Sequence, residues 1–368
     1  MPYGVSWFPL RSRRRLTGAR DVKSSYHAGL DPLIEAAART RAGWTCMTVP
    51  LAPPGEGDWS RLEGRAAAGH KAFVLRQHLE LVRRCRAAGA GPILVREFST
   101  KPLLVVAGRL RRLRRRLWFV VNHNLQWTLT DRVERACFVL LDRLGFRFAF
   151  FETTDLDLLR RYGIDASRHA VLPHPVATDS GGRPASDDGA VPRVGVVGHY
   201  RAEKGADDVV ARLAAAPSGG WRVVVGAPGI EAVRRRAPWR DAPGVETRDT
   251  SDPAEYRRLL SECAAVVLNN RRDAYEYRPS GILADAAGAG ASVLAPDFPV
   301  LQVQIAEPVV VGRAFPSGGD PVPALSALLE DRRRGAHDFA AYRAGRSAPA
   351  LAERLDAIAD PGRGGAED

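Results

Sequence analysis

The sequence predicts an α/β protein of two lobes, and three observations support this. Short β-branched runs alternate with segments of helical apolar spacing along most of the chain. Residues 177–192, rich in Gly, Ser, Asp and Pro, interrupt the alternation, which then starts again. The length of 368 residues exceeds one average domain. We therefore expect an N-terminal domain at 1–176, a linker at 177–192, a C-terminal domain at 193–345, and a closing helix with a flexible tail at 346–368.

In the first lobe, runs of β-branched and aromatic residues predict buried strands. These strands are expected at 5–9, 45–50, 92–96, 117–122, 147–151 and 169–173. Apolar residues at helical spacing predict helices between them. These helices are expected at 26–40, 71–88, 102–116, 133–144 and 155–162. Strands that alternate with helices in this way favour a doubly wound parallel sheet.

The same alternation organises the second lobe. Strands are expected at 194–197, 221–226, near 245, and at 264–268, 292–295 and 308–311. Helices are expected at 206–215, 230–236, 253–261, 280–287, 323–329 and 350–358. The predicted fold is therefore two Rossmann-like, doubly wound lobes that face a central cleft. Ligands of such sheets bind outside the carboxyl ends of the strands.

Composition narrows the class of protein and its partners. A net charge of +12 and a pI near 10.1 favour anionic partners. Basic residues interleaved with aromatics, or a helix that could read bases, are not found, so nucleic acid is not an expected partner. The scattered cysteines lack CxxC spacing, which indicates reduced thiols in a cytoplasmic protein. We expect no secretory signal at the N-terminus and no segment that spans a bilayer.

The stretch 102–116, PLLVVAGRLRRLRRR, mixes apolar residues with a run of arginines. One interpretation is a surface helix that touches anionic lipid, which would place the protein peripherally at the inner membrane face. The other is a solvated helix whose cations favour the negative end of its dipole.

The stretch Val194–Gly205, VGVVGHYRAEKG, predicts a strand, a tight turn and the start of a helix. Gly198 ends the strand, and Arg201 and Lys204 fall in the turn before the helix at 206–215. A helix N-terminus offers unpaired N–H groups and a positive dipole end, so cations there predict a phosphate or diphosphate site. An ordinary βα turn with a solvated Arg and Lys is the alternative.

Two polar residues follow strands of the first lobe directly. His123 comes after the strand at 117–122, where it could face a ligand or be a hydrogen-bonded loop histidine. Glu152 comes after the strand at 147–151, and the alternative for it is a helix-capping carboxylate.

A second anion site is predicted where Ser280 and Gly281 open a helix, because the backbone amides there can meet a phosphate. Glu276 and Asp285 are carboxylates near this site, suited to the hydroxyls of a ribose or sugar. The alternatives are a solvated helix carboxylate for Asp285 and, for Arg278, a surface salt bridge worth under about 1 kcal/mol.

Four segments resemble, in the same order, motifs of the retaining glycosyltransferases of the GT-B fold known as group 1 or family 4. The segments are VVNHN at Val120–Asn124, AVLPHPV at Ala170–Val176, VGVVGHYRAEKG, and SGILADAAGAGASVLAP at Ser280–Pro296. The resemblance covers nearly the full chain. Of the family's two carboxylates, Asp285 matches the second, while the first falls on Tyr277, next to Glu276.

The resemblance implies transfer of a sugar from a UDP- or GDP-sugar to a glycan, lipid-linked or natural-product acceptor, with retention at the anomeric carbon. It implies that His123 lies near the donor sugar and that Arg201 and Lys204 hold the diphosphate. The implied donor-binding residues are Gly198, His199, Glu276, Arg278, Ser280, Gly281, Ile282 and Asp285. No metal or cofactor is expected. Two alternatives stay open: a catalytically degenerate protein of this fold that acts as a partner, and a nucleotide-sugar epimerase of the same fold.

Overall fold

The computed structural model describes residues 30–40, 44–49, 65–122, 124–176, 191–216 and 220–359. The strand expected at 5–9 and residues 177–190 of the expected linker lie outside these ranges. The chain forms two compact units. Unit 1 holds the chain up to Phe151, Leu156–Leu172 and the residues from Ala352 onward, and unit 2 holds Glu152–Asp155 and Pro173–Leu351.

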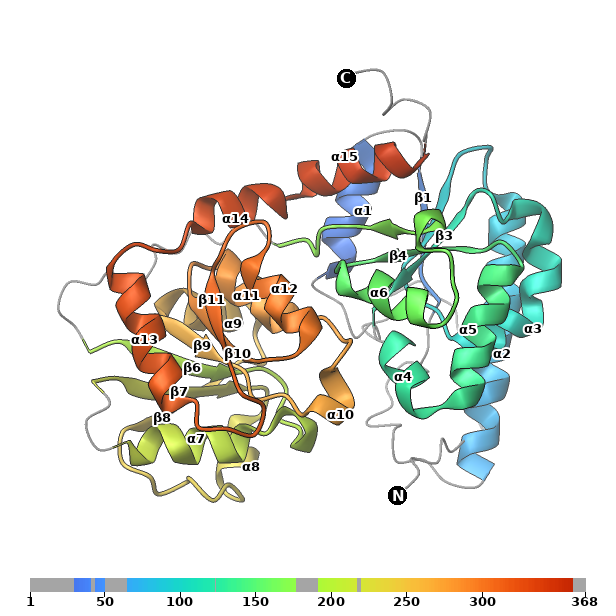
Figure 1. The fold of residues 1–368 in the computed structure, drawn as a ribbon. Helices are drawn as coiled ribbons and strands as arrows, with labels where there is room; N and C mark the ends of the chain where they lie inside the picture. The colour runs from blue at the N-terminus through green and yellow to red at the C-terminus, as the bar shows by residue number, and fades with distance from the viewer. Residues whose placement is uncertain are drawn as a thin grey trace. The chain divides into compact units, whose positions relative to one another are not determined.

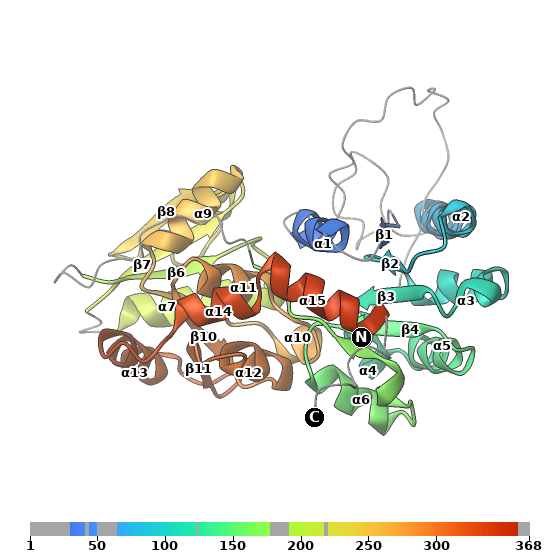
Figure 2. The ribbon, with the colours of Figure 1, turned by 90° about the horizontal axis from the view of Figure 1, so that it is seen from above.

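Unit 1 contains a parallel five-stranded sheet in the order β1-β2-β3-β4-β5. The strands are β1 (Thr45–Met47), β2 (Ile93–Val95), β3 (Leu117–Val121), β4 (Arg147–Phe150) and β5 (Ala170–Val171). The helices are α1 (Leu30–Thr40), α2 (Arg65–Ala87), α3 (Thr100–Leu110), α4 (Asn124–Thr130), α5 (Arg132–Arg143) and α6 (Thr154–Arg161), with 3-10 turns η2 (Arg111–Leu113) and η3 (Ala166–Arg168). Figure 2 shows α2, α3 and α5 in a row on one side of the strands.

Aromatic rings fill the core of unit 1. All five residues of β3 are buried, and the ring of Phe148 on β4 stacks on that of Phe138, with centroids 4.4 Å apart. Helix α3 buries Leu103, Val106 and Leu110 at helical spacing. The apolar side of the stretch 102–116 is therefore used in the core, and the helix ends before the last arginines of the stretch.

Unit 2 contains a parallel six-stranded sheet in the order β11-β10-β9-β6-β7-β8 (Figure 1). The strands are β6 (Arg193–Val197), β7 (Arg222–Ala227), β8 (Val245–Asp249), β9 (Ala265–Val267), β10 (Ser292–Pro296) and β11 (Gly312–Phe315). The helices are α7 (Ala206–Ala215), α8 (Ile230–Arg234), α9 (Pro253–Glu262), α10 (Arg272–Tyr275), α11 (Gly281–Gly288), α12 (Pro299–Ala306), α13 (Val322–Arg333), α14 (Phe339–Gly345) and α15 (Ala348–Ala359), which continues into unit 1. A 3-10 turn, η4 (Ala202–Lys204), precedes α7.

Successive strand residues of unit 2 point to opposite faces, so each face has its own core. Val194 and Val196 pack with α7, α8 and α13. Val197 packs instead with α9, α11 and α12. This alternation is the expected period of a strand buried on both sides.

The prediction of a last strand at 308–311 is wrong, because that strand is β11, at Gly312–Phe315. Gly312 pairs with Val293, and a Cβ built on it would lie 2.0 Å from the Val293 carbonyl oxygen. Gly312 is therefore the first residue of the strand, at a position where a side chain would collide with the neighbouring strand. Four helices were also not predicted: α4, α10, α12 and α14.

None of the helices in the described ranges combines the length and apolar character needed to cross a bilayer.

Candidate functional site

The predicted anion site falls where the winding of the unit 2 sheet reverses. Strand β6 has β7 on one side and β9 on the other, so the chain leaves β6 in one direction and returns to its other side with β9. Ligands of open parallel sheets bind at such a switch point, outside the carboxyl ends of the strands. The two turns there are residues 198–205 after β6 and 268–280 after β9.

Gly198 allows the first turn to pass close to helix α11. Its φ is +117°, and a Cβ built on it would lie 2.2 Å from Ile282 Cδ1 and 3.2 Å from Lys204 Nζ. A side chain at this position would collide with Ile282 and crowd the ammonium group. The structure thus brings together three predicted residues: Gly198, Lys204 and Ile282.

The two turns are joined to each other by hydrogen bonds. Asn269 Nδ2 donates to the Gly205 carbonyl at 3.0 Å, and the Arg271 amide donates to the Glu203 carbonyl at 2.8 Å. Gly205 has φ +55°, and a Cβ on it would lie 2.6 Å from the Asn269 carbonyl oxygen. We call the two hydrogen bonds that join the turns, Asn269 to Gly205 and Arg271 to Glu203, the Asn269 clamp. Asn269 follows strand β9, but its role in joining the turns could be found only from the structure.

Three cations meet in this region, and we call Arg201, Lys204 and Arg278 the cation cluster. Burial and the charges of Arg201 and Arg278 together lower the pKa of Lys204 to about 8, and the charge of Glu203 acts in the opposite direction. Lys204 forms no ion pair with a described residue. Arg201 lies 3.8 Å from Glu203, and Arg278 stacks over the ring of Tyr275 at 4.7 Å.

His199 lies beside the cation cluster. Its pKa is lowered from the ordinary value by burial and by the charges of Arg201 and Lys204. The imidazole is therefore mainly neutral at pH 7, so it adds a hydrogen-bonding group without adding charge.

The start of α11 offers backbone amides. Ser280 is the N-cap, and its Oγ accepts from the Leu283 amide at 3.3 Å. The Ser280 amide donates to Gln304 Oε1 at 2.8 Å, which fixes the N-cap. The amides of Gly281 and Ile282 have no intrahelical acceptor because they belong to the first turn.

The predicted carboxylates have different surroundings. Asp285 Oδ2 accepts from the Tyr256 hydroxyl at 2.8 Å, and burial raises the pKa of Asp285. Glu276 pairs with Arg272 at 3.2 Å. Tyr277, where the family resemblance would put a carboxylate, is buried. Tyr256 was not predicted, since it lies 29 residues before Asp285 on another helix.

Two candidates of the first lobe remain. His123 lies outside the described residues. Glu152 forms an ion pair with Arg346 at 3.4 Å, and the two side chains are only 3% and 4% exposed. Arg346 also donates to the Glu307 carbonyl at 2.9 Å. Glu152 is therefore part of a buried structural pair.

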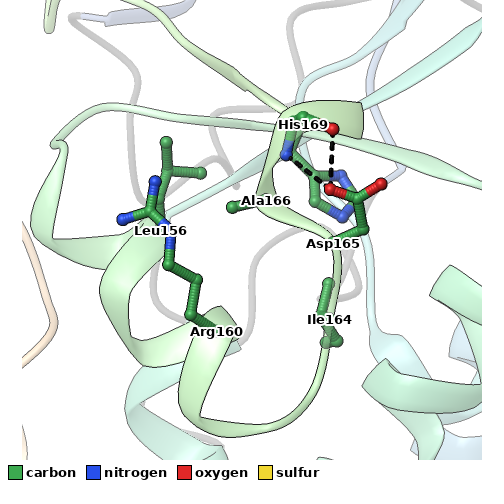
Figure 3. A pocket seen from close by; sticks show the side chains of 7 residues that line it. Leu156, Arg160, Ile164, Asp165, Ala166 and His169 are labelled. Atoms are coloured by element: carbon green, nitrogen blue, oxygen red, sulfur yellow. Dashed lines mark hydrogen bonds between the residues drawn. The ribbon is translucent and has the colours of Figure 1, made fainter.

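Two hollows of unit 1 are lined by none of the predicted site residues that the structure describes. The first, of about 530 Å³, is lined by Leu156, Arg160, Ile164 and their neighbours (Figure 3). In this hollow the carboxylate of Asp165 accepts hydrogen bonds from the amide and hydroxyl of Ser167, at 3.0 and 2.6 Å. The second, of about 510 Å³, is lined by four arginines. The two hollows share Ser167 and His169.

Within the described ranges, His, Cys, Asp and Glu side chains do not come together in a group of three or more that could hold a metal ion.

Comparison with solved structures identifies the fold. The structure is similar to that of Alr3699/HepE from Anabaena in complex with UDP, with 14% sequence identity over 92% of this chain and 96% of that chain, and a TM-score of 0.64. The fold is GT-B. Trehalose 6-phosphate synthase from Burkholderia multivorans is also similar, with 14% identity over 79% of this chain and 75% of that chain and a TM-score of 0.56.

A third similar structure is sucrose-phosphate synthase from Thermosynechococcus elongatus, with 16% identity over 89% of this chain and 88% of that chain and a TM-score of 0.56. No protein-family model matches the sequence, and a search of curated proteins gave no match. At these identities the likeness establishes the GT-B fold, in agreement with the predicted fold class.

Proposed function

We propose that the protein is a retaining, metal-independent glycosyltransferase that moves a sugar from a UDP- or GDP-sugar to an acceptor. The observation that carries this proposal is the cation cluster at the switch point of the unit 2 sheet. Its three positive charges lie beside the first turn of α11, and Lys204 forms no direct ion pair with a carboxylate among the described residues. That Alr3699/HepE was solved with UDP and with UDP-glucose supports a nucleotide-sugar donor.

In this proposal the diphosphate of the donor lies between the cation cluster and the start of α11. Lys204 and Arg201 neutralise its charge, with Arg278 at the edge, and the amides of Gly281 and Ile282 donate to its oxygens. Gly198 lets the turn approach the start of α11 closely, with Lys204 beside it. Asp285 accepts from a sugar hydroxyl, and the Tyr256 hydroxyl bond orients the carboxylate.

Catalysis would be electrostatic. As the bond to the sugar breaks, negative charge grows on the leaving diphosphate, and the fixed cations and amides stabilise it. These groups are held in place before the donor binds, by the Asn269 clamp and by the bond of Ser280 to Gln304. No side-chain nucleophile is needed in this scheme. His123 near the donor sugar stays a prediction, as do the acceptor class, the cytoplasmic location and contact with an anionic membrane.

The experiment is thermal unfolding of the protein with UDP, GDP, ADP and dTDP, alongside the variant Lys204→Ala. A ligand at about 100 times its Kd stabilises by about 2.7 kcal/mol, which gives a clear rise in Tm. We expect one nucleotide to raise the Tm of the wild type and to leave the variant nearly unchanged. That nucleotide then defines the donor sugars for a transfer assay, and the configuration of the product tests retention.

A degenerate protein of the same fold is the second candidate. The observation that favours it is the loss of the first carboxylate, because Tyr277 is buried and Glu276 is engaged by Arg272. A nucleotide shift without turnover of any donor sugar would favour this candidate. Conversion of the donor sugar without an acceptor would favour an epimerase, and the absence of any shift would contradict the proposed donor site.

A further inference from the structure

The second hollow of unit 1 is a basic pocket, and we call it the arginine hollow. It is lined by Arg114, Arg115, Arg147 and Arg168. Arg114 and Arg115 precede strand β3, Arg147 opens β4, and Arg168 precedes β5. The hollow therefore lies at the amino ends of these parallel strands, at the edge of the sheet opposite to the one where such folds usually bind ligands.

Three of the four guanidinium groups are held in place by the fold. Arg168 Nη1 lies 3.2 Å from Asp142 Oδ1, and its Nη2 donates to the Asp142 carbonyl at 3.2 Å. Arg147 stacks over the ring of Trp118 at 5.2 Å. Arg114 packs over Gly145, where an added Cβ would lie 2.9 Å from its Nε. A site with fixed donors loses little conformational entropy when a ligand binds.

The carboxylates of Asp142 and Asp165, both of which act on Arg168, balance only part of the positive charge of the arginine hollow. Asp142 pairs with Arg168, whereas Arg114, Arg115 and Arg147 form no ion pair with any described residue. Burial lowers the pKa of Arg147, and the charges of Arg115 and Arg168 lower it further. Four like charges around one hollow repel one another, and an anion bound among them would remove that repulsion.

Shape and chemistry narrow the ligand. Guanidinium groups bind phosphate oxygens through paired hydrogen bonds. A volume of about 510 Å³ lies in the range of small-molecule sites. Trp118 and Ile358 add apolar surface to the lining, which suits a carbon skeleton attached to the phosphate.

We propose that the arginine hollow binds a phosphate-bearing anion, either a free phosphate or diphosphate compound or the phosphate of a lipid headgroup. This site is separate from the proposed donor site, because all its residues belong to unit 1 and the cation cluster belongs to unit 2. The assignment therefore does not depend on the proposed transferase activity.

The test compares two double variants that lose the same charge. Arg115→Gln/Arg147→Gln removes two arginines of the hollow that have no ion pair with a described residue. Arg112→Gln/Arg132→Gln is the matched control, since both arginines are exposed and neither lines the hollow. All proteins carry Lys204→Ala to silence the donor site, and thermal unfolding verifies that each one folds.

Two probes separate the sources of phosphate. The first is inorganic pyrophosphate, titrated by calorimetry in a buffer without phosphate. The second is co-sedimentation with phosphatidylcholine vesicles, with and without phosphatidylglycerol. We expect binding to weaken about 100-fold in the hollow variant, the loss expected for two charge-assisted contacts, and to persist in the control.

Pyrophosphate binding that only the hollow variant loses supports a soluble phosphate ligand. Binding to phosphatidylglycerol vesicles that only the hollow variant loses supports a lipid headgroup. Equal weakening in both double variants would mean a diffuse surface charge and would overturn the proposal. The proposal would also be overturned if the parent Lys204→Ala protein bound neither pyrophosphate nor the phosphatidylglycerol vesicles.

Discussion

Arg346 and Lys204 are two cations of unit 2 that are withdrawn from water in opposite ways. Arg346 lies 3.4 Å from Glu152 and donates to the Glu307 carbonyl. Burial lowers the pKa of Arg346, but Tyr342 and Glu152 outweigh this effect and raise it. For Lys204, burial and the charges of the neighbouring Arg201 and Arg278 lower the pKa to about 8. Arg346, the matched cation, has a direct ion pair and stabilises the fold. Lys204, the unmatched cation, has no direct ion pair with a described residue and destabilises the fold, which is expected of a group placed for a ligand.

The largest effect is expected from breaking the matched pair. Arg346→Met leaves Glu152 buried without its partner, and we expect a loss of about 3–5 kcal/mol in the free energy of unfolding at about pH 9, where the carboxyl is ionised in the wild type. Burial raises the pKa of Glu152 to about 7, against the effect of Arg346, so the carboxyl is more easily neutralised in the variant. The loss should therefore shrink as the pH falls from about 9 to about 6, because the carboxyl is mainly neutral in both proteins at the lower pH.

Chemical denaturation of Arg346→Met, Glu152→Gln and the double variant measures this coupling. The double variant should recover much of the stability, because neither charge is left alone. A single variant as stable as the wild type would mean that the pair is not structural, and the comparison with Lys204 would fail.

The next effect tests the space beside the unmatched cation. Gly198→Ala places a Cβ against Ile282 at a φ of +117°, and we expect a loss of about 3 kcal/mol from backbone strain and overpacking together. Gly229→Ala is the matched control, since Gly229 has φ +63° in the same unit with no atom within 4 Å of the added Cβ. It should lose about 1 kcal/mol, because only the backbone term applies. Equal losses by thermal unfolding would show that the contact with Ile282 and Lys204 has no cost.

The smallest effect on stability comes from removing the unmatched charge. Without nucleotide, Lys204→Ala should be more stable than wild type at pH 7 by about 1 kcal/mol, because the desolvation cost exceeds the packing lost. The folded-state pKa of Lys204, about 8, lies below the unfolded value of 10.5. The unfolded state therefore binds more protons between these values, so wild-type stability rises relative to the variant as the pH rises through them.

Nucleotide binding should have the opposite dependence on pH. The affinity of the wild type for the active nucleotide should fall as the pH rises above about 8, because Lys204 loses its charge. Calorimetric titration from pH 7 to pH 10 measures this fall, and Lys204→Ala should bind weakly with little pH dependence. A wild-type affinity that stays constant over the range would show that Lys204 is not the cation on the diphosphate.

Local periodicity was enough to predict most of the fold. Helix α7 lies at Ala206–Ala215 as expected, because its apolar residues repeat at helical spacing and glycine precedes them. Helix α12, PVLQVQIA, was missed because it is apolar on most sides and short. Strand β11 was misplaced because Gly312 is required by close contact with a neighbouring strand. A local sequence pattern does not contain such a contact.

The candidate site could be predicted in part for the same reason. Gly198, Lys204 and Ile282 follow strands or open a helix at one edge of the sheet, so topology alone brings them together. The partner of Asp285, Tyr256, comes from another helix and could not be predicted, whereas Arg272, the partner of Glu276, lies only four residues before it. The sequence did not predict a site at Arg147 and Arg168, because these residues are far from Arg115 along the chain and only the fold brings them to the same hollow.

The Asn269 clamp has a kinetic consequence. Since hydrogen bonds already hold the two turns together at 3.0 and 2.8 Å, the turns need no slow rearrangement before a ligand enters. Capture of a dianion should then be governed by diffusion in the field of the cations, with an association rate that falls steeply as ionic strength rises. Differences in residence time among nucleotides would arise after this encounter, in how quickly each one escapes.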